Sequence, residues 1–158
     1  MEKARVLVLT GSSSDLPRME QCLKMLGTFG IEGSLVVASA HRSPQKVADA
    51  IRDAEDSGVE VIIAGAGMSA HLPGVVASLT NLPVIGVPLD SGMPGGMDAL
   101  LSIVQMPPGI PVATVAVGGA KNAAVLAARM LSIKYPEVSR LHREYRRELE
   151  GPSPGTGA

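Results

Sequence analysis

Short apolar runs alternate with helix-like segments along most of the chain, and no other feature constrains the fold as much. The run Val6–Leu9 is continuously apolar and is followed by Gly11, which is typical of a strand buried on both faces. In the next segment Met19, Cys22 and Leu23 recur at helical spacing. Because buried strands that alternate with helices form parallel sheets, we expect an α/β domain with helices on both faces of one sheet.

Glycine and proline mark where each expected element starts and stops. A proline near the first turn and a glycine after the last residue are typical helix boundaries. The expected strands are Val6–Leu9, Leu35–Val37, Val59–Ala64, Pro83–Val87 and Val112–Ala116. The expected helices are about Asp15–Phe29, Pro44–Asp56, 70–80, Asp98–Val104 and Ala120–Ser132, with an additional C-terminal helix at about Glu137–Glu150. We expect the five strands to form one parallel sheet.

The length and composition fit a single domain over residues 1–150, followed by a disordered tail at 151–158. Of the 158 residues 46% are hydrophobic and 18% are charged, a balance that argues against disorder and suggests that partner subunits cover some apolar surface. The net charge of −1 gives no basic field to attract nucleic acid or a membrane surface. No apolar run approaches the ~20 residues of a membrane helix, and no signal peptide is visible. We therefore expect a cytoplasmic protein.

Several kinds of site are excluded by what the sequence lacks. Cys22 is the single cysteine, so neither a disulfide framework nor a multi-cysteine metal site is expected, and its place on an apolar stripe suits a structural thiol. There is no G-x-x-x-x-G-K-[ST] phosphate-binding loop. The histidines His41, His71 and His142 show no metal-ligand spacing. We expect no metal and no cofactor.

In parallel α/β folds ligands bind beyond the carboxyl ends of the strands, which directs attention to the loops after Leu9, Val37, Ala64 and Val87. The first loop, Gly11–Asp15, carries three serines at a helix N-terminus, where hydroxyls and free N–H groups favour an anion. Asp15 suits a ribose hydroxyl or a polar ring better than a phosphate. The alternative interpretation is ordinary helix capping by Ser14 or Asp15.

The second loop places His41 and Arg42 at the end of a strand and before a helix. The planar guanidinium of Arg42 can bind phosphate or carboxylate through two parallel hydrogen bonds. A histidine such as His41 can donate and accept a proton within one turnover. The alternative is a histidine–arginine pair on the surface with no role in chemistry.

The third loop, Gly65–Gly74, matches a G-x-G-x-x-A dinucleotide pattern at Gly65, Gly67 and Ala70. The match follows the third strand rather than the first, and the chain is too short for two nucleotide-binding halves. We interpret these glycines as allowing the backbone to approach a ligand closely, with His71 lining the same pocket. A lone histidine is more often a packed or capping residue than a catalyst.

Taken together, these loops resemble the class I N5-carboxyaminoimidazole ribonucleotide mutases. The resemblance covers about Arg5 to Leu131 and departs from many members at Met68-Ser69, where they have Gly-Ala, and at Leu16, where they have Trp. It rests on Gly11-Ser-Ser-Ser-Asp15, Ser39-Ala-His-Arg42, Gly65-Ala-Gly67, Ala70-His-Leu-Pro-Gly74, Pro83-Val-Ile-Gly-Val-Pro88, Leu101-Ser-Ile-Val-Gln-Met-Pro107 and Pro111-Val-Ala-Thr114.

The resemblance implies a three-layer, flavodoxin-like αβα domain that assembles into an octamer with sites at subunit contacts. By position it implies that His41 is the catalytic acid and base and that Arg42 binds the nucleotide phosphate. It also implies that Ser12 and Asp15 bind substrate. The pocket-lining positions it implies are Ser14, Ser39, Gly67 and His71.

The implied reaction interconverts N5-carboxyaminoimidazole ribonucleotide and 4-carboxy-5-aminoimidazole ribonucleotide in purine biosynthesis, by decarboxylation and recarboxylation. Three alternatives remain open. A class II carboxylase would use CO2 directly, but that class usually has Lys where this chain has Arg42. An FMN-binding flavodoxin-like module would stack aromatic side chains, of which the chain has only Phe29, Tyr135 and Tyr145. A receiver-type signalling module needs an acceptor Asp after the third strand, where this chain has Ala64-Gly65.

Overall fold

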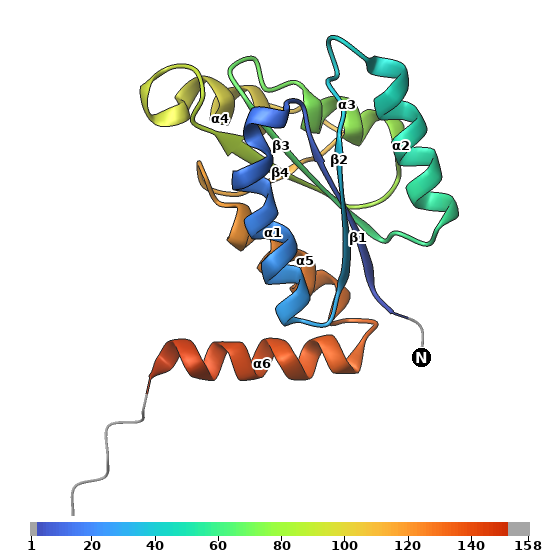
Figure 1. The fold of residues 1–158 in the computed structure, drawn as a ribbon, viewed down its shortest axis with the longest axis vertical. Coiled ribbons are helices and arrows are strands. Elements are labelled where there is room, and N and C mark those ends of the chain that lie inside the picture. The colour runs from blue at the N-terminus through green and yellow to red at the C-terminus, as the bar shows by residue number, and fades with distance from the viewer. Residues whose placement is uncertain (1–2, 152–158) are drawn as a thin grey trace, which may run out of the picture.

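The structure is a computed structural model that describes residues 3–151, and it contains one parallel sheet flanked by helices (Figure 1). The strand order is β2-β1-β3-β4-β5, so the chain starts near the centre, moves to one edge and then crosses back. Every neighbouring pair is parallel. The strands are β1 (Arg5–Thr10), β2 (Glu32–Val37), β3 (Val61–Gly67), β4 (Val84–Leu89) and β5 (Ala113–Thr114).

The helices form a layer on each face of the sheet, as Figure 1 shows. Helices α1 and α5 pack on one face, and α2, α3 and α4 pack on the other. Four of the six α-helices have a proline in their first turn, where the missing N–H costs nothing. The helices are α1 (Leu16–Thr28), α2 (Pro44–Asp56), α3 (Leu72–Leu79), α4 (Met97–Val104), α5 (Ala120–Leu131) and α6 (Pro136–Glu150), with short 3-10 turns η1 (Ser13–Asp15) and η2 (Pro94–Gly96).

Successive residues of the central strands enter opposite cores, which is why their sequences are continuously apolar. In β1, Val6 and Val8 pack toward α1 and α5, whereas Leu7 and Leu9 pack toward α2 and α3. All four side chains are at most 2% exposed. This two-sided burial confirms the expected three-layer αβα domain with five parallel strands.

Helix α6 lies across the lower end of the molecule in Figure 1 and confirms the expected additional C-terminal helix. The fully buried Phe29, just beyond α1, meets Tyr145 edge to face, with ring centroids 5.4 Å apart. Helix α6 therefore closes the end of the core that α1 and α5 leave open. No helix within residues 3–151 is long and apolar enough to span a membrane. The predicted disordered tail lies outside the described residues, apart from Gly151.

All five expected strands differ in their bounds from the structure, and β2 begins three residues earlier than expected, at Glu32. The differences at β3 and β5 have a clear cause. Strand β3 runs on to Gly67, three residues past the expected end at Ala64, because Ala66 and Gly67 still pair with Pro88 and Leu89. Strand β5 is only two residues long, against the five expected. The carbonyls of Gly86 and Pro88 face β5 and accept from Val115 and Gly118, but Pro88 has no N–H to donate in return, so the ladder stops.

Candidate active site

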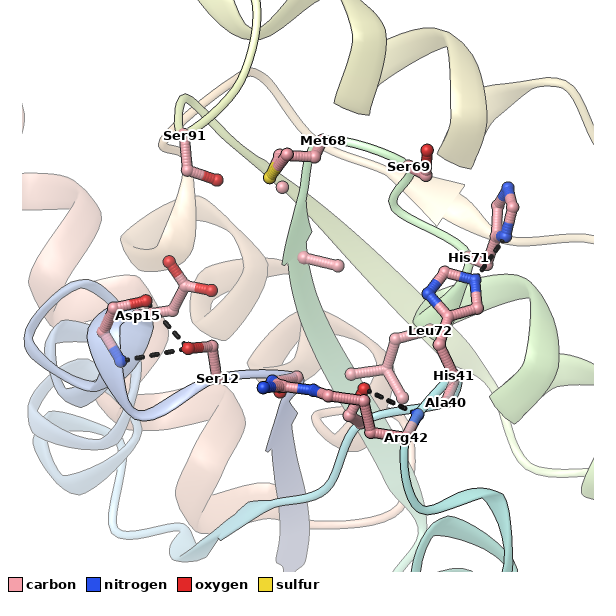
Figure 2. Close-up of a pocket in the computed structure, with 15 residues that line it drawn as sticks. Ser12, Asp15, Ala40, His41, Arg42, Met68, Ser69, His71, Leu72 and Ser91 are labelled. Carbon is pink, nitrogen blue, oxygen red and sulfur yellow. Dashed lines mark hydrogen bonds between the residues drawn. The ribbon is translucent and has the colours of Figure 1, made fainter.

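A cavity of about 490 Å³ opens at the carboxyl ends of the strands, where the sequence predicted a ligand site. It lies at the topological switch point of the sheet, between β1 and β3. From β1 the chain continues outward to β2, and from β3 it continues in the opposite direction to β4. Figure 2 shows that side chains from separate loops face one another around it. The lining consists of Gly11, Ser12, Ser14, Asp15, Ser39, Ala40, His41, Arg42, Ala66, Gly67, Met68, Ser69, His71, Leu72 and Ser91.

All eight site residues implied by the family resemblance line this one cavity: Ser12, Ser14, Asp15, Ser39, His41, Arg42, Gly67 and His71. The loop after β1 supplies the serines and Asp15, the loop after β2 supplies His41 and Arg42, and β3 with its loop supplies Gly67 and His71. The chain thus brings together residues as far apart as Ser12 and His71 because parallel strands end at the same edge of the sheet.

In the first loop the capping residue is Ser12. Its Oγ accepts from the backbone N–H of Ser14 at 3.3 Å and lies 2.8 Å from the Ser14 hydroxyl. Asp15 makes no side-chain capping bond to α1. The capping alternative, which assigned this role to Ser14 or Asp15, was therefore wrong about the residue. A serine two residues before Ser14 fits because the loop first forms the 3-10 turn η1.

The carboxyl group of Asp15 is buried at the floor of this loop, with the residue only 6% exposed. Burial raises the pKa of Asp15, and the guanidinium of Arg18, 3.6 Å away, opposes that rise. A desolvated carboxyl with free lone pairs is a strong acceptor for hydroxyl or amine hydrogens. Asp15 is thus placed to bind a polar, uncharged part of a ligand.

The second loop is folded by its own side chains. The Ser39 hydroxyl accepts from the backbone N–H of Arg42 at 3.2 Å, and the N–H of Ser39 donates to the Ser43 hydroxyl at 3.3 Å. The guanidinium of Arg42 reaches back to the first loop, where Nη2 donates to the carbonyl of Gly11 at 3.1 Å. The guanidinium lies on the side of the loop that faces the cavity (Figure 2). Within residues 3–151 it forms no ion pair with a carboxylate. Its other N–H groups are available to an anion.

His41 and His71 form a pair that the sequence did not reveal. His41 Nε2 lies 2.7 Å from His71 Nδ1, and the rings meet edge to face with centroids 4.8 Å apart (Figure 2). A hydrogen bond between two ring nitrogens needs one donor and one acceptor, so at least one of the two imidazoles is neutral. His71 stands at the N-terminus of α3 and makes no capping bond. His71 lines the cavity, as expected, and the alternative role of a capping residue is wrong.

The glycines of the third loop serve packing within the protein as well as the cavity. A side chain at Gly65 would collide with the sulfur of Met19, and one at Gly67 would collide with the hydroxyl of Ser91. Gly65 lies inside β3, so the expectation that it lets a ligand approach was wrong. Gly67 does line the cavity. Helix α3 begins only at Leu72, after the dinucleotide-like pattern has ended.

Sequence reasoning missed several lining residues, above all Ser91. The loop after Val87 was marked for inspection, but nothing in its sequence separated Ser91 from its neighbours. Met68 was noted only as a departure from the family, yet it is the one non-glycine residue with a positive φ (56°) within the described part of the chain. Its side chain is 60% exposed at the rim of the cavity.

Cys22 and His142 lie away from the cavity. Cys22 is fully buried, and burial raises the pKa of its thiol to about 12, which agrees with a structural role. His142 packs on Phe29 with ring centroids 5.9 Å apart. Within residues 3–151 no three His, Cys, Asp or Glu side chains gather in a way that could hold a metal ion.

Comparisons with known proteins agree with this arrangement. The chain is 53% identical to the N5-carboxyaminoimidazole ribonucleotide mutase of Thermotoga maritima over 92% of this chain and 85% of that protein. It is 55% identical to the mutase of the same name from Pyrococcus abyssi over 92% and 84%. The crystal structure of Treponema denticola PurE has the same flavodoxin-like fold, with a TM-score of 0.82, 32% identity, and coverage of 94% of this chain and 92% of that one.

A family model described as AIR carboxylase matches residues 5–151. The match runs from the first residue of β1 to the end of α6 and includes all of the loops that build the cavity. This chain therefore belongs to the AIR carboxylase family.

Proposed function

We propose that this chain is an N5-carboxyaminoimidazole ribonucleotide mutase of purine biosynthesis, an isomerase that moves a carboxylate from the exocyclic amine to ring carbon C4. Relatives more than half identical over most of both chains carry that name. The observation that supports it most directly is the convergence of His41, Arg42 and Asp15 on one cavity. A proton carrier, an anion ligand and a hydrogen-bond acceptor are what an aminoimidazole nucleotide requires.

The positions of these groups suggest how the substrate lies. Arg42 binds the phosphate, because its guanidinium carries free donors beside the N–H groups of the Gly11 loop. Ser12 and Asp15 bind the ribose hydroxyls. Ser14 and Ser39 border these two contacts. The ring then extends toward the histidine pair, with Gly67 beside it.

In the proposed reaction His41 moves one proton in each direction. The carbamate C–N bond of the substrate breaks, its electron pair stays on the nitrogen, and His41 protonates that nitrogen as CO2 departs. Carbon C4 of the aminoimidazole then attacks the trapped CO2, and His41 removes the proton from C4. The carboxylate that leaves is the one that returns, so the balance needs neither ATP nor an oxidant. Holding CO2 next to C4 is a proximity effect, which is worth roughly 7–11 kcal/mol at best.

Two alternatives receive less support. Binding of FMN would call for aromatic rings at the cavity, but Phe29 and Tyr145 pack against each other under α6 and neither lines it. A class II carboxylase would use the same cavity with CO2 from solution. The two reactions differ in the source of the carboxylate, so they are separated by an isotope experiment.

That experiment supplies the unlabelled carboxyamino substrate in buffer that contains labelled bicarbonate and stops the reaction early. The proposal expects product almost free of label, because CO2 formed inside the cavity is attacked before it exchanges. Extensive label in the first product, or rapid turnover of aminoimidazole ribonucleotide with bicarbonate alone, would instead establish class II chemistry.

An octamer is also proposed, with the cytoplasm as its location. Beside the cavity, Met93, Met97, Leu101 and Val104 expose about half or more of their surface in the single chain. Apolar groups gathered in this way are costly in water and are normally covered by another subunit. Light scattering should find an assembly of about eight chains (an even-numbered closed ring or dihedral form), and a stable, active monomer would contradict the proposal.

A further inference from the structure

The turn that carries Ser91 into the cavity is held by a residue outside the cavity. Strand β4 ends at Leu89, and the chain then turns sharply through Gly92 and Met93 before η2 and α4. Within this turn Ser91 is the residue that lines the cavity. Its hydroxyl occupies the space that a side chain at Gly67 would fill, so it lies directly against the end of β3. Figure 2 shows it on the same side of the cavity as Asp15 and Met68.

Asp98, in the first turn of α4, reaches back to this turn. Its Oδ2 accepts a hydrogen bond from the backbone N–H of Met93 at 3.1 Å. Gly92 packs so tightly against the same carboxyl group that any side chain there would collide with Oδ2 and come within 3.2 Å of Cγ. Met68 Cγ would lie 3.1 Å from the same added side chain. The space beside Gly92 is thus filled by the carboxyl of Asp98 and the side chain of Met68. This packing and the Met93–Asp98 hydrogen bond together form a clamp on the turn.

Burial of the second carboxylate oxygen of Asp98 lowers the stability of the folded protein. Oδ1 is buried and has no hydrogen-bond partner within residues 3–151. Burying a carboxylate oxygen without a partner loses its hydration and gains nothing in return. An apolar residue at this position would avoid that loss, and the hydrogen bond that Oδ2 accepts from Met93 offsets it.

We propose that Asp98 is a positioning residue for the mutase reaction: through the Met93 N–H it fixes the turn that places the Ser91 hydroxyl in the substrate cavity. The inference rests on the proposed function, since it assigns Ser91 a contact with the substrate of that reaction. Asp98 itself does not line the cavity. A helix is a rigid support, and the clamp ties the turn to α4 in addition to the hydrogen bond from the Ser91 N–H to the Leu89 carbonyl at 3.1 Å.

The test is a double-mutant cycle on the activity with N5-carboxyaminoimidazole ribonucleotide. Ser91→Ala and Asp98→Ala should each lower kcat/KM about tenfold or more, as expected when a contacting group is lost or displaced by about 1 Å. The two variants should divide the loss between kcat and KM in the same way. The double variant should be no worse than either single variant, because the second change removes a contact that is already lost. Asp98→Asn should restore most activity, since the amide oxygen can accept from Met93.

Ser102→Ala is the matched control. It removes another hydrogen bond of α4, from the Ser102 hydroxyl to the backbone carbonyl of Asp98 at 2.7 Å, and does not touch the turn. Its kcat/KM should stay within about twofold of the wild type. Losses that multiply in the double variant, or an Asp98→Ala variant as active as the wild type, would overturn the proposal. So would an unchanged Ser91→Ala variant.

A measurement without substrate separates this inference from the proposed function. Hydrogen exchange followed by mass spectrometry should show the segment with the Met93 amide exchanging faster in Asp98→Ala but not in Asp98→Asn. Equal exchange in wild type and Asp98→Ala overturns the clamp even if the enzyme is a mutase. If Asp98→Ala does not fold, Gly92→Ala displaces the same turn and should reproduce the Ser91→Ala loss; full activity of Gly92→Ala would equally overturn the inference.

Discussion

Replacing His41 by Asn tests whether this histidine carries the protons. The amide preserves part of the ring's shape but cannot take up or release a proton at neutral pH. Loss of a positioned acid–base group costs about 100- to 10,000-fold in rate, or about 3–5 kcal/mol of transition-state stabilisation. We expect kcat to fall within this range while nucleotide binding, which we propose depends on Arg42 and Asp15, persists.

The histidine pair indicates how large the loss of kcat should be within that range. His71 Nδ1 lies 2.7 Å from His41 Nε2, so a second imidazole remains beside the substrate in His41→Asn and can supply part of the proton transfer through water. His41→Asn should therefore lie near the lower end of the range, and the double variant His41→Asn/His71→Asn near the upper end. His71→Asn alone should cost less than His41→Asn.

Stability provides the control for this prediction. His41 and His71 are both exposed, and their mutual hydrogen bond is readily replaced by water. The free energy of unfolding should change by less than about 0.5 kcal/mol. The assay is single-turnover conversion of the carboxyamino substrate, together with denaturant unfolding. A His41→Asn enzyme with kcat within tenfold of the wild type and an intact fold would refute the assignment of His41.

Three further predictions concern the same molecule. Arg42→Lys should raise KM about ten- to a hundredfold with a smaller effect on kcat, because an ammonium group cannot make the two parallel hydrogen bonds that a guanidinium makes to a phosphate. An unchanged KM in steady-state kinetics would show that the phosphate binds elsewhere. Asp15→Asn should raise the thermal midpoint and weaken substrate binding, because burial holds the pKa of Asp15 above its usual value and its charge is costly; calorimetry that found a lower midpoint would contradict this. The pKa of His142 is lowered by burial and then by Arg129 and Arg146, so the unfolded state binds more protons below about pH 6.5, and stability should fall as the pH drops through that window. The difference in denaturant midpoint between about pH 7.5 and about pH 5.5 should shrink in His142→Gln, and an undiminished difference would assign the effect to other groups.

The sequence by itself determined the elements and the place of the site. Helix α2 has the expected bounds, Pro44–Asp56, because proline starts it and Gly58 follows its end. Strands β1, β3 and β4 were recognisable because burial on both faces leaves no polar side chain in Val6–Leu9, Val61–Ala66 and Val84–Leu89. Once the sheet is parallel, the loops after these strands must share one edge. Periodicity and the topology of parallel sheets thus suffice for the cavity and for His41, Arg42 and Asp15.

Only the tertiary structure decided which groups meet within that cavity. The contact of His41 with His71 joins two loops thirty residues apart, and no local pattern encodes the distance between them. Gly65 and Gly67 looked alike in the sequence, but one makes room for Met19 and the other for Ser91. Likewise Asp98 is an ordinary acidic residue in the first turn of a helix until the fold brings its carboxyl to the N–H of Met93. Local signals fix elements because they depend on neighbours along the chain, whereas side-chain contacts depend on packing between elements, which the chain satisfies only once it is folded.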